Sequence, residues 1–242
     1  MKLKTFYKAL FLDLDHTLCD TADADRKGEH FFGQMLFQEQ IDGEMECFKA
    51  ASLFMNALYH GHSDCERILD ENETDYRSRL IQFAVASQTH FKPDLKKSKY
   101  WLEAVMDHRI KSLSFFEGTV ELLEKLSSNY KLIVITNGPL YSQKPKVDKL
   151  QITKWTDHVL MCGAFPWQKP DPRIFQEALK RVNCSSEEVI HVGDSLKSDI
   201  QGAWNAGIDS IWISDKKTLN ESDPVPNAIV ESFVDLENLL RV

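Results

Sequence analysis

The sequence predicts an α/β protein in which a Rossmann-like, doubly wound parallel sheet forms a core and an α-helical bundle is inserted into it. Three observations carry this prediction. Short apolar segments closed by polar residues or glycine recur along the chain, helical segments lie between them, and a long stretch without strand-like segments follows the first. We therefore expect a core domain of residues 1–19 and 114–242 and a helical cap domain of residues 20–113.

Five segments of the core are predicted strands. Each is short and mostly apolar, as expected for a strand that is buried on both faces of a parallel sheet. They are residues 9–14 (ALFLDL), 131–138 (KLIVITNG), 158–163 (HVLMCG), 188–194 (EVIHVGD) and 209–214 (DSIWIS).

Four segments between these strands are predicted helices. They are residues 119–129 (TVELLEKLSSN), 147–152 (VDKLQI), 171–182 (DPRIFQEALKRV) and 198–207 (SDIQGAWNAG). Strands and helices that alternate in this way imply right-handed crossovers, with helices on both faces of the sheet.

The inserted stretch has helical periodicity and no strand-like segment, so we expect about four helices in it. Two sets of apolar residues mark helix faces, and glycine or proline separates the helices. The faces are Phe48, Ala51, Met55 and Leu58, and then Trp101, Val105 and Ile110; the breaks are near Gly43, Gly61 and Pro93.

Composition excludes several classes of protein. The formal charge of −8 disfavours binding to nucleic acid polymers or anionic membranes. No run of about 18 apolar residues is present, and the N-terminus lacks a signal-peptide cleavage site. The five cysteines are odd in number and form no Cys-x-x-Cys pair, which favours a reducing compartment. We expect a cytoplasmic monomer or homodimer that acts on a small molecule.

Asp13 and Asp15 are the first residues that suggest chemistry. In an extended strand, residues at i and i+2 project to the same side, so two carboxylates would lie together at a strand end. Two carboxylates so close together repel each other, which favours a bound cation such as Mg²⁺, a proton shared between them, or both. A pair of solvated acids in a turn is the alternative for this motif alone.

Other polar groups follow the later strands. Because the carboxyl ends of parallel strands meet at one edge, we expect these groups to converge there with Asp13 and form a cradle for phosphate and Mg²⁺. They are Thr136, Asn137, Gly138, Lys169, Gly193, Asp194, Ser195 and Asp199. Singly, each has a structural alternative: Lys169 as a loop lysine, Asp199 as an acid in the first turn of a helix, and Thr136 as a strand cap.

Four segments together resemble the motifs of the haloacid dehalogenase-like hydrolase superfamily. They are residues 13–20 (DLDHTLCD), 136–138 (TNG), 169–175 (KPDPRIF) and 193–199 (GDSLKSD). Their order and the inserted helical stretch are similar to the branch of phosphatases with a helical cap. Residues 20–28 (DTADADRKG) and 136–144 (TNGPLYSQK) look like N-acylneuraminate-9-phosphatases and the related pyrimidine 5′-nucleotidases. Phe116-Glu117-Gly118 departs from this likeness, since relatives usually have a Pro-Gly turn there.

This resemblance implies catalytic roles. Asp13 would attack phosphorus and form an aspartyl-phosphate, and Asp15 would protonate the leaving oxygen and then activate water. Lys169 would neutralise charge, and Thr136, Asn137 and Gly138 would hold phosphoryl oxygens. Asp13, the main-chain carbonyl of Asp15 and Asp194 would bind Mg²⁺, with Asp199 supporting the metal-bound water or Lys169.

Substrate choice and rival functions remain open at this level. Arg26 is a candidate substrate contact in the cap, although an exposed helix face is the alternative. A haloacid dehalogenase would need no second acid, so Asp15 argues against it. A phosphosugar mutase shares the catalytic groups, and a receiver domain or a scaffold without activity is a more distant alternative. Sialic acid phosphates, other sugar phosphates and nucleoside monophosphates all stay possible as substrates.

Overall fold

A computed structural model describes residues 3–4, 6–65, 72–215 and 218–240. Its chain divides into two compact units, residues 1–21 with 114–242 and residues 22–113. The second unit falls within residues 20–113, and the assignment of these residues as a cap domain stays a prediction.

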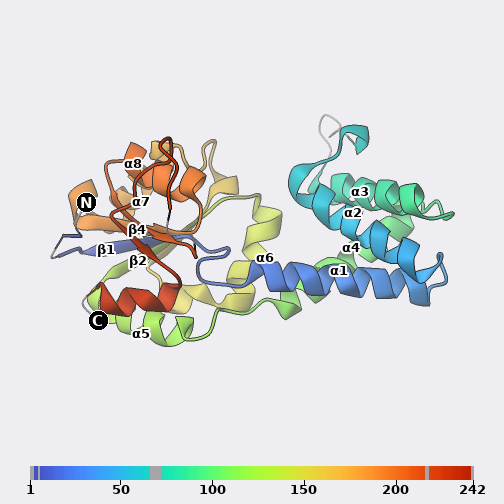
Figure 1. Cartoon of the computed structure of the whole chain (residues 1–242), viewed down its shortest axis with the longest axis horizontal. Helices are drawn as coiled ribbons and strands as arrows, with labels where there is room; N and C mark the ends of the chain where they lie inside the picture. Colours follow the sequence, from blue (N-terminus) through green and yellow to red (C-terminus); the bar gives the residue numbers. More distant parts are fainter. Residues whose placement is uncertain (1–2, 5, 66–71, 216–217, 241–242) are drawn as a thin grey trace. The chain divides into compact units, whose positions relative to one another are not determined.

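The core contains a six-stranded, fully parallel sheet in the order β3-β2-β1-β4-β5-β6, which confirms the predicted fold class. Figure 1 labels β1, β2 and β4 of this sheet. The strands are β1 (Ala9–Leu12), β2 (Lys131–Thr136), β3 (His158–Met161), β4 (Val189–Gly193), β5 (Asp209–Ile213) and β6 (Ala228–Val230). Two features of the prediction were wrong. All five expected strands end one or two residues earlier than predicted, so that β1 ends before Asp13 and β2 before Asn137. β6 was not expected, because three apolar residues are too short a signal.

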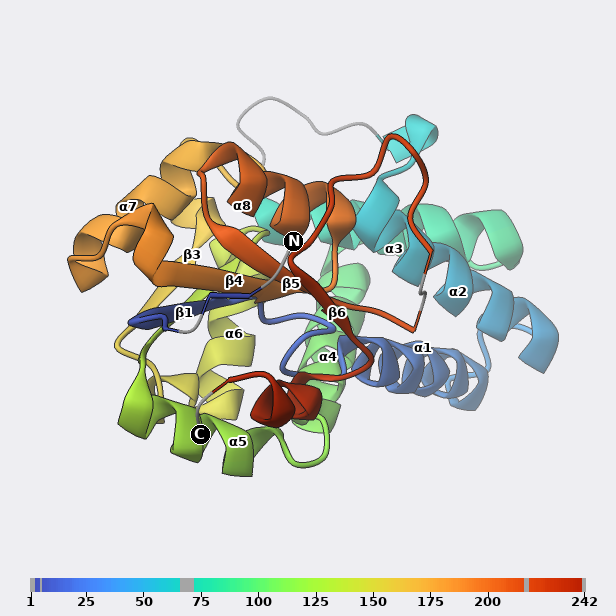
Figure 2. The ribbon, with the colours of Figure 1, turned by 60° about the vertical axis from the view of Figure 1, so that its left-hand side comes forward.

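Helices pack on both faces of the sheet, as the alternation predicts. α7 (Pro172–Val182) and α8 (Gln201–Asn205) lie on one side and α5 (Thr119–Asn129) on the other (Figure 2). Alternate residues of β1 point to opposite faces, so Ala9 and Phe11 join the core formed with α7 and α8. Gly118 precedes α5 with a φ of +75°, a conformation that glycine adopts without strain.

Two predicted helices differ from the observed ones. α6 (Leu140–Leu150) begins seven residues before the expected segment 147–152, directly after the turn that closes β2. The segment expected as one helix at 198–207 begins instead as a π-helical turn, Leu196–Ile200, and continues into the short α8. The early start of α6 brings the polar side chains of Gln143 and Lys146 into contact with Asp15.

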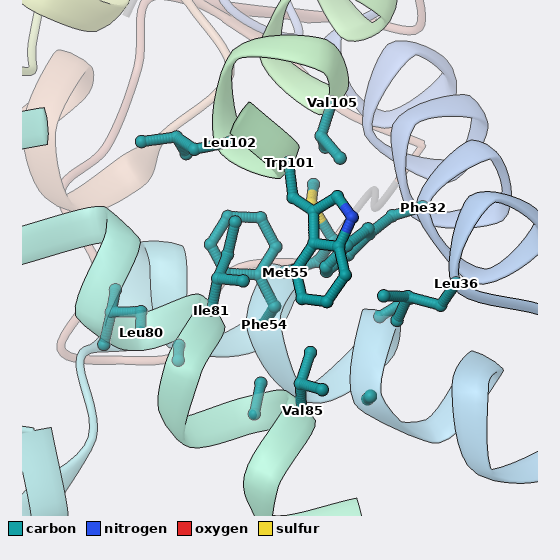
Figure 3. Close-up of a cluster of buried hydrophobic side chains, with 14 of the residues drawn as sticks. Phe32, Leu36, Phe54, Met55, Leu80, Ile81, Val85, Trp101, Leu102 and Val105 are labelled. Atoms are coloured by element: carbon teal, nitrogen blue, oxygen red, sulfur yellow. The ribbon is translucent and has the colours of Figure 1, made fainter. Parts of the chain in front are cut away.

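The second unit contains four long helices in its described part. They are α1 (Thr21–Gln38), whose first residue belongs to the core unit, α2 (Glu44–His60), α3 (Glu73–Gln88) and α4 (Leu95–Ser112). Their apolar faces enclose one core around the fully buried Trp101 (Figure 3). The Trp101 indole nitrogen donates to Glu39 at 3.1 Å, so its polar atom is satisfied. No helix in the described ranges is long and apolar enough to cross a membrane.

Candidate active site

The carboxyl ends of β1, β2 and β4 bring the predicted polar residues to one edge of the sheet. β1 lies between β2 and β4: after β1 the chain adds β2 and β3 on one side, then crosses to β4 and adds β5 and β6 on the other side. Open α/β sheets bind ligands where the strand order reverses in this way. Asp13 directly follows β1, Thr136 ends β2, and Gly193 ends β4. The Asp13 main-chain N–H donates to the carbonyl oxygen of Val192 at 2.9 Å, which ties the first loop to β4.

Lys169 is buried and joins two carboxylates. Its Nζ donates to Asp13 Oδ1 and to Asp199 Oδ1, the latter at 2.6 Å. Burial raises the pKa of Asp13, and the Lys169 charge opposes this effect. Burial would lower the pKa of Lys169, but the two carboxylates outweigh it and the pKa rises. Lys169 is therefore held as an ammonium beside Asp13.

The side chain of Asn137 positions Lys169. Its Nδ2 donates to the Lys169 carbonyl at 2.9 Å, and its Oδ1 accepts from the Lys169 main-chain N–H at 3.0 Å. These reciprocal bonds connect the loop after β2 to the loop that carries the lysine. These bonds use both the Nδ2 and the Oδ1 atoms of Asn137, so the side-chain amide binds the main chain of Lys169.

Thr136 and Gly138 lie on either side of Asn137 and behave differently. The Thr136 hydroxyl is buried and has no hydrogen-bond partner among the described residues. A buried hydroxyl without a partner costs free energy unless a ligand or water satisfies it. Gly138 has a φ of +114°, and a Cβ there would lie 2.9 Å from Gln143 Nε2, so only glycine fits this turn.

Asp199 organises the β4 side of the site. Besides Lys169, it accepts from the main-chain N–H of Ser195 at 3.0 Å and contacts His191 Nε2 at 3.0 Å. Burial would raise its pKa, but Lys169 and His191 outweigh burial and lower it. Both carboxylate oxygens are thus occupied by protein groups, which favours a supporting role for Asp199. His191 was missed from the sequence, where it is one polar residue within an apolar strand.

Asp15 has a separate set of partners. Its carboxylate accepts from Thr21 Oγ1 at 2.6 Å, Lys146 Nζ at 2.7 Å and Gln143 Nε2 at 3.0 Å. Burial would raise the pKa of Asp15, but Lys146 and these hydrogen bonds outweigh burial and lower it. Lys146 and Gln143 also escaped the sequence analysis, because polar residues in a helix usually face solvent.

Three carboxylates could hold a metal ion. Asp13, Asp194 and Asp199 each offer an oxygen, and these oxygens lie within 4.8 Å of one another. Burial, together with the charge of Asp199, raises the pKa of Asp194 to about 6. Hard oxygen ligands and crowded negative charge fit Mg²⁺.

Arg26 lies in the second unit, on α1. Its side chain is exposed and pairs with Asp23 at 3.1 Å, while Lys27 pairs with the same carboxylate at 2.6 Å. These are the contacts of an exposed helix face. A role for Arg26 in binding substrate stays a prediction.

Comparison with curated proteins finds relatives along nearly the whole chain. The chain is 28% identical to the human (Homo sapiens) N-acylneuraminate-9-phosphatase, over 97% of this chain and 94% of the relative. It is 27% identical to pyrimidine 5′-nucleotidase PynA of Streptococcus pneumoniae, over 97% and 95%. Both relatives carry the names of phosphoric monoester hydrolases, which is the predicted enzyme class, and both predicted likenesses are confirmed.

The fold and the family agree with these relatives. The putative HAD-hydrolase YfnB of Bacillus subtilis, solved bound to magnesium, superposes with a TM-score of 0.71 at 19% identity, covering 98% of this chain and all of the other. Some other solved neighbours are dehalogenases by name. Residues 41–213 match the model of the haloacid dehalogenase-like hydrolases. The chain therefore belongs to the haloacid dehalogenase-like hydrolase family.

Proposed function

We propose that this protein is a Mg²⁺-dependent phosphatase of a small phosphorylated metabolite. The observation that carries the proposal is the buried contact of Asp13 with Lys169 beside a second acid, Asp15, that has its own partners. The substrate class follows the relatives: a sugar phosphate such as N-acylneuraminate 9-phosphate, or a nucleoside 5′-monophosphate.

In the first half-reaction, a carboxylate oxygen of Asp13 forms a bond to phosphorus while the bond from phosphorus to the leaving oxygen breaks. Lys169 neutralises charge on the nucleophile and on the phosphoryl group. The Thr136 hydroxyl, which has no hydrogen-bond partner within the described part of the chain, would hold a phosphoryl oxygen. Since the Asn137 side chain holds Lys169, its role toward phosphate would fall to its main-chain N–H, next to Gly138.

Asp15 acts first on the leaving oxygen of the substrate and then on the water that attacks the aspartyl-phosphate. Protonated, it gives its proton to the departing alcohol oxygen; as a carboxylate, it then takes a proton from the water that attacks the aspartyl-phosphate. The second step returns the Asp13 carboxylate and releases inorganic phosphate. A halide leaves carbon without a proton, so dehalogenation needs no second acid. The hydrogen bonds that Thr21 and Gln143 donate to the Asp15 carboxylate therefore favour hydrolysis of a phosphate ester over dehalogenation.

Asp13, Asp194 and the main-chain carbonyl of Asp15 would hold Mg²⁺, with Asp199 supporting this site through Lys169 and the Ser195 N–H. When bound, the ion would neutralise the phosphate and the crowded carboxylates. Burial raises the pKa values of Asp13 and Asp194, and the charge of Asp199 adds to this effect at both.

Residues 20–113 would act as a cap that selects the substrate. This unit joins the core through two connections, and a unit tethered at two points can move as a lid and exclude water from the aspartyl-phosphate. The side chains that choose the metabolite would then come from this unit, while the core supplies the chemistry.

The test is release of inorganic phosphate across a panel of phosphomonoesters, with Mg²⁺ or with excess EDTA. The panel includes N-acylneuraminate 9-phosphate, nucleoside 5′-monophosphates and other sugar phosphates. We expect hydrolysis that needs Mg²⁺ and is absent from an Asp13→Asn preparation. Full activity in EDTA, or chloride release from 2-chloropropionate without phosphatase activity, would overturn the proposal.

A further inference from the structure

Lys146 is buried against the proposed acid of the reaction. Its side chain is 4% exposed, and its Nζ lies 2.7 Å from Asp15 Oδ1. Gln143, one turn earlier on α6, donates to the other Asp15 oxygen at 3.0 Å and also donates to the Asn137 carbonyl oxygen. One helix therefore contributes donors to both oxygens of the carboxylate.

A second lysine on the same helix shows how unusual this arrangement is. Lys144 pairs with Asp148 at 2.7 Å, but its side chain is 64% exposed, as is typical of a surface ion pair that contributes little. Taking a lysine out of water is costly and is compensated only by a well-placed opposite charge. Lys146 has such a partner in Asp15, which is 131 residues away in the sequence.

We propose that Lys146, assisted by Gln143, is a positioning residue that fixes the carboxyl group of Asp15 for proton transfer to and from the substrate oxygen. This inference rests on the proposed phosphatase function. Proton transfer requires the acid to lie within hydrogen-bond reach of the leaving oxygen. Asp15 lies beyond the end of β1, where its backbone makes an isolated bridge with Cys19, and the orientation of its carboxyl group depends on donors from other segments.

The proton balance explains why a cation suits this place. As Asp13 bonds to phosphorus, the electron pair of the breaking P–O bond stays on the leaving oxygen, which takes the Asp15 proton. Asp15 is left as a carboxylate facing the Lys146 ammonium, the arrangement seen in the structure. The same carboxylate, held by Lys146, Gln143 and Thr21, then takes a proton from water.

Leaving groups of different acidity separate this role from a general loss of structure. p-Nitrophenolate departs without a proton, whereas a primary alcohol must be protonated as it leaves. We therefore compare kcat/KM for p-nitrophenyl phosphate with kcat/KM for the best alkyl phosphomonoester of the panel. For each ester, kcat/KM reports only the steps up to release of the alcohol, so the later attack of water on the aspartyl-phosphate does not affect it.

Lys146→Met should lower kcat/KM for the alkyl ester at least about tenfold more than for p-nitrophenyl phosphate. Lys146→Arg, which restores a cation, should recover part of the loss. Lys144→Met is the matched control on α6 and should leave both values unchanged. Gln143→Leu should show the same preference to a smaller degree, and it provides a second test if Lys146→Met does not fold.

A double-mutant cycle with Asp15→Asn completes the experiment. If Lys146 acts through Asp15, Lys146→Met should cause no further loss on the alkyl ester once Asp15 is replaced. Equal losses on both esters in the single variants, or additive losses in the cycle, would overturn this inference while the wild-type activity still supports a phosphatase. A wild-type protein that hydrolyses no phosphomonoester would instead refute the proposed function.

Discussion

Gly193→Ala tests the packing that places Asp199 against the site. A Cβ at Gly193 would lie 2.6 Å from both Cβ and Oδ2 of Asp199, whereas ordinary contacts are 3.4–4 Å. Asp199 would have to move by about 1 Å, which would stretch its 2.6 Å bond to Lys169 beyond hydrogen-bond length. Only the absence of a side chain at Gly193 allows this approach.

Two costs follow from that displacement. Overpacking a buried site costs roughly 1–3 kcal/mol, and weakening a charged hydrogen bond adds about 1 kcal/mol or more, so we expect a loss of roughly 2–4 kcal/mol in the free energy of unfolding. A displacement of about 1 Å in the groups that hold Lys169 should also lower kcat/KM about 100-fold. Urea unfolding followed by circular dichroism and steady-state phosphate release would measure the two effects.

Gly207→Ala is the control, because it strains the backbone away from the site. Gly207 has a φ of +70°, and the nearest atom to an added Cβ is Ser186 Oγ at 3.7 Å. This variant should lose about 1 kcal/mol of stability from the left-handed conformation and keep its activity. If Gly193→Ala kept wild-type stability and kcat/KM, the close approach of Asp199 would not matter and the reasoning would be refuted.

Three further predictions concern other parts of the molecule. Asp13→Asn should lower turnover by at least about 1,000-fold with little change in the unfolding temperature, since repulsion from Asp199 is relieved as the contact with Lys169 weakens; appreciable turnover in a clean preparation would remove the covalent mechanism. Burial lowers the pKa of His191 below its unfolded value, although Asp199 opposes this, so at this residue the unfolded state binds more protons and the contribution of His191 to the free energy of unfolding should fall as pH drops below about 6.5. The raised pKa values of Asp13 and Asp194 add a slope of opposite sign to wild type and variant alike, so the measurement is the difference between wild type and His191→Gln in urea titrations between pH 7 and 5; a difference that does not change with pH would refute the assignment to His191. Arg26→Ala should alter the preference among phosphomonoesters more than the activity on p-nitrophenyl phosphate; a common factor for all substrates would argue against a selecting cap.

The strands and most residues at their ends were predictable because their signals are local. Short apolar runs predict buried strands, and parallel connectivity brings the carboxyl ends of these strands to one edge, independently of the conformation of the loops. Asp13, Thr136, Lys169 and Asp194 could therefore be assigned to one edge before any contact was known. β6 was missed because Ala228–Val230 is too short to show a period.

The partners of these residues depended on contacts that no local pattern encodes. Lys146 looks like Lys144 in the sequence, yet one is buried against Asp15 and the other is exposed. His191 looks like a polar interruption of β4, yet it contacts Asp199 within the core.

The fold class, the inserted helical stretch and the four groups of polar residues at the sheet edge could be inferred from the sequence, because each depends on periodicity or on strand ends. The pairing of each lysine with its carboxylate became known from the three-dimensional contacts. Lys169 meets Asp13 and Asp199, while Lys146 meets Asp15, across separations of 30 to 156 residues. The physical reason is that an ion pair depends on distance in space, and the order β3-β2-β1-β4 together with the early start of α6 sets those distances.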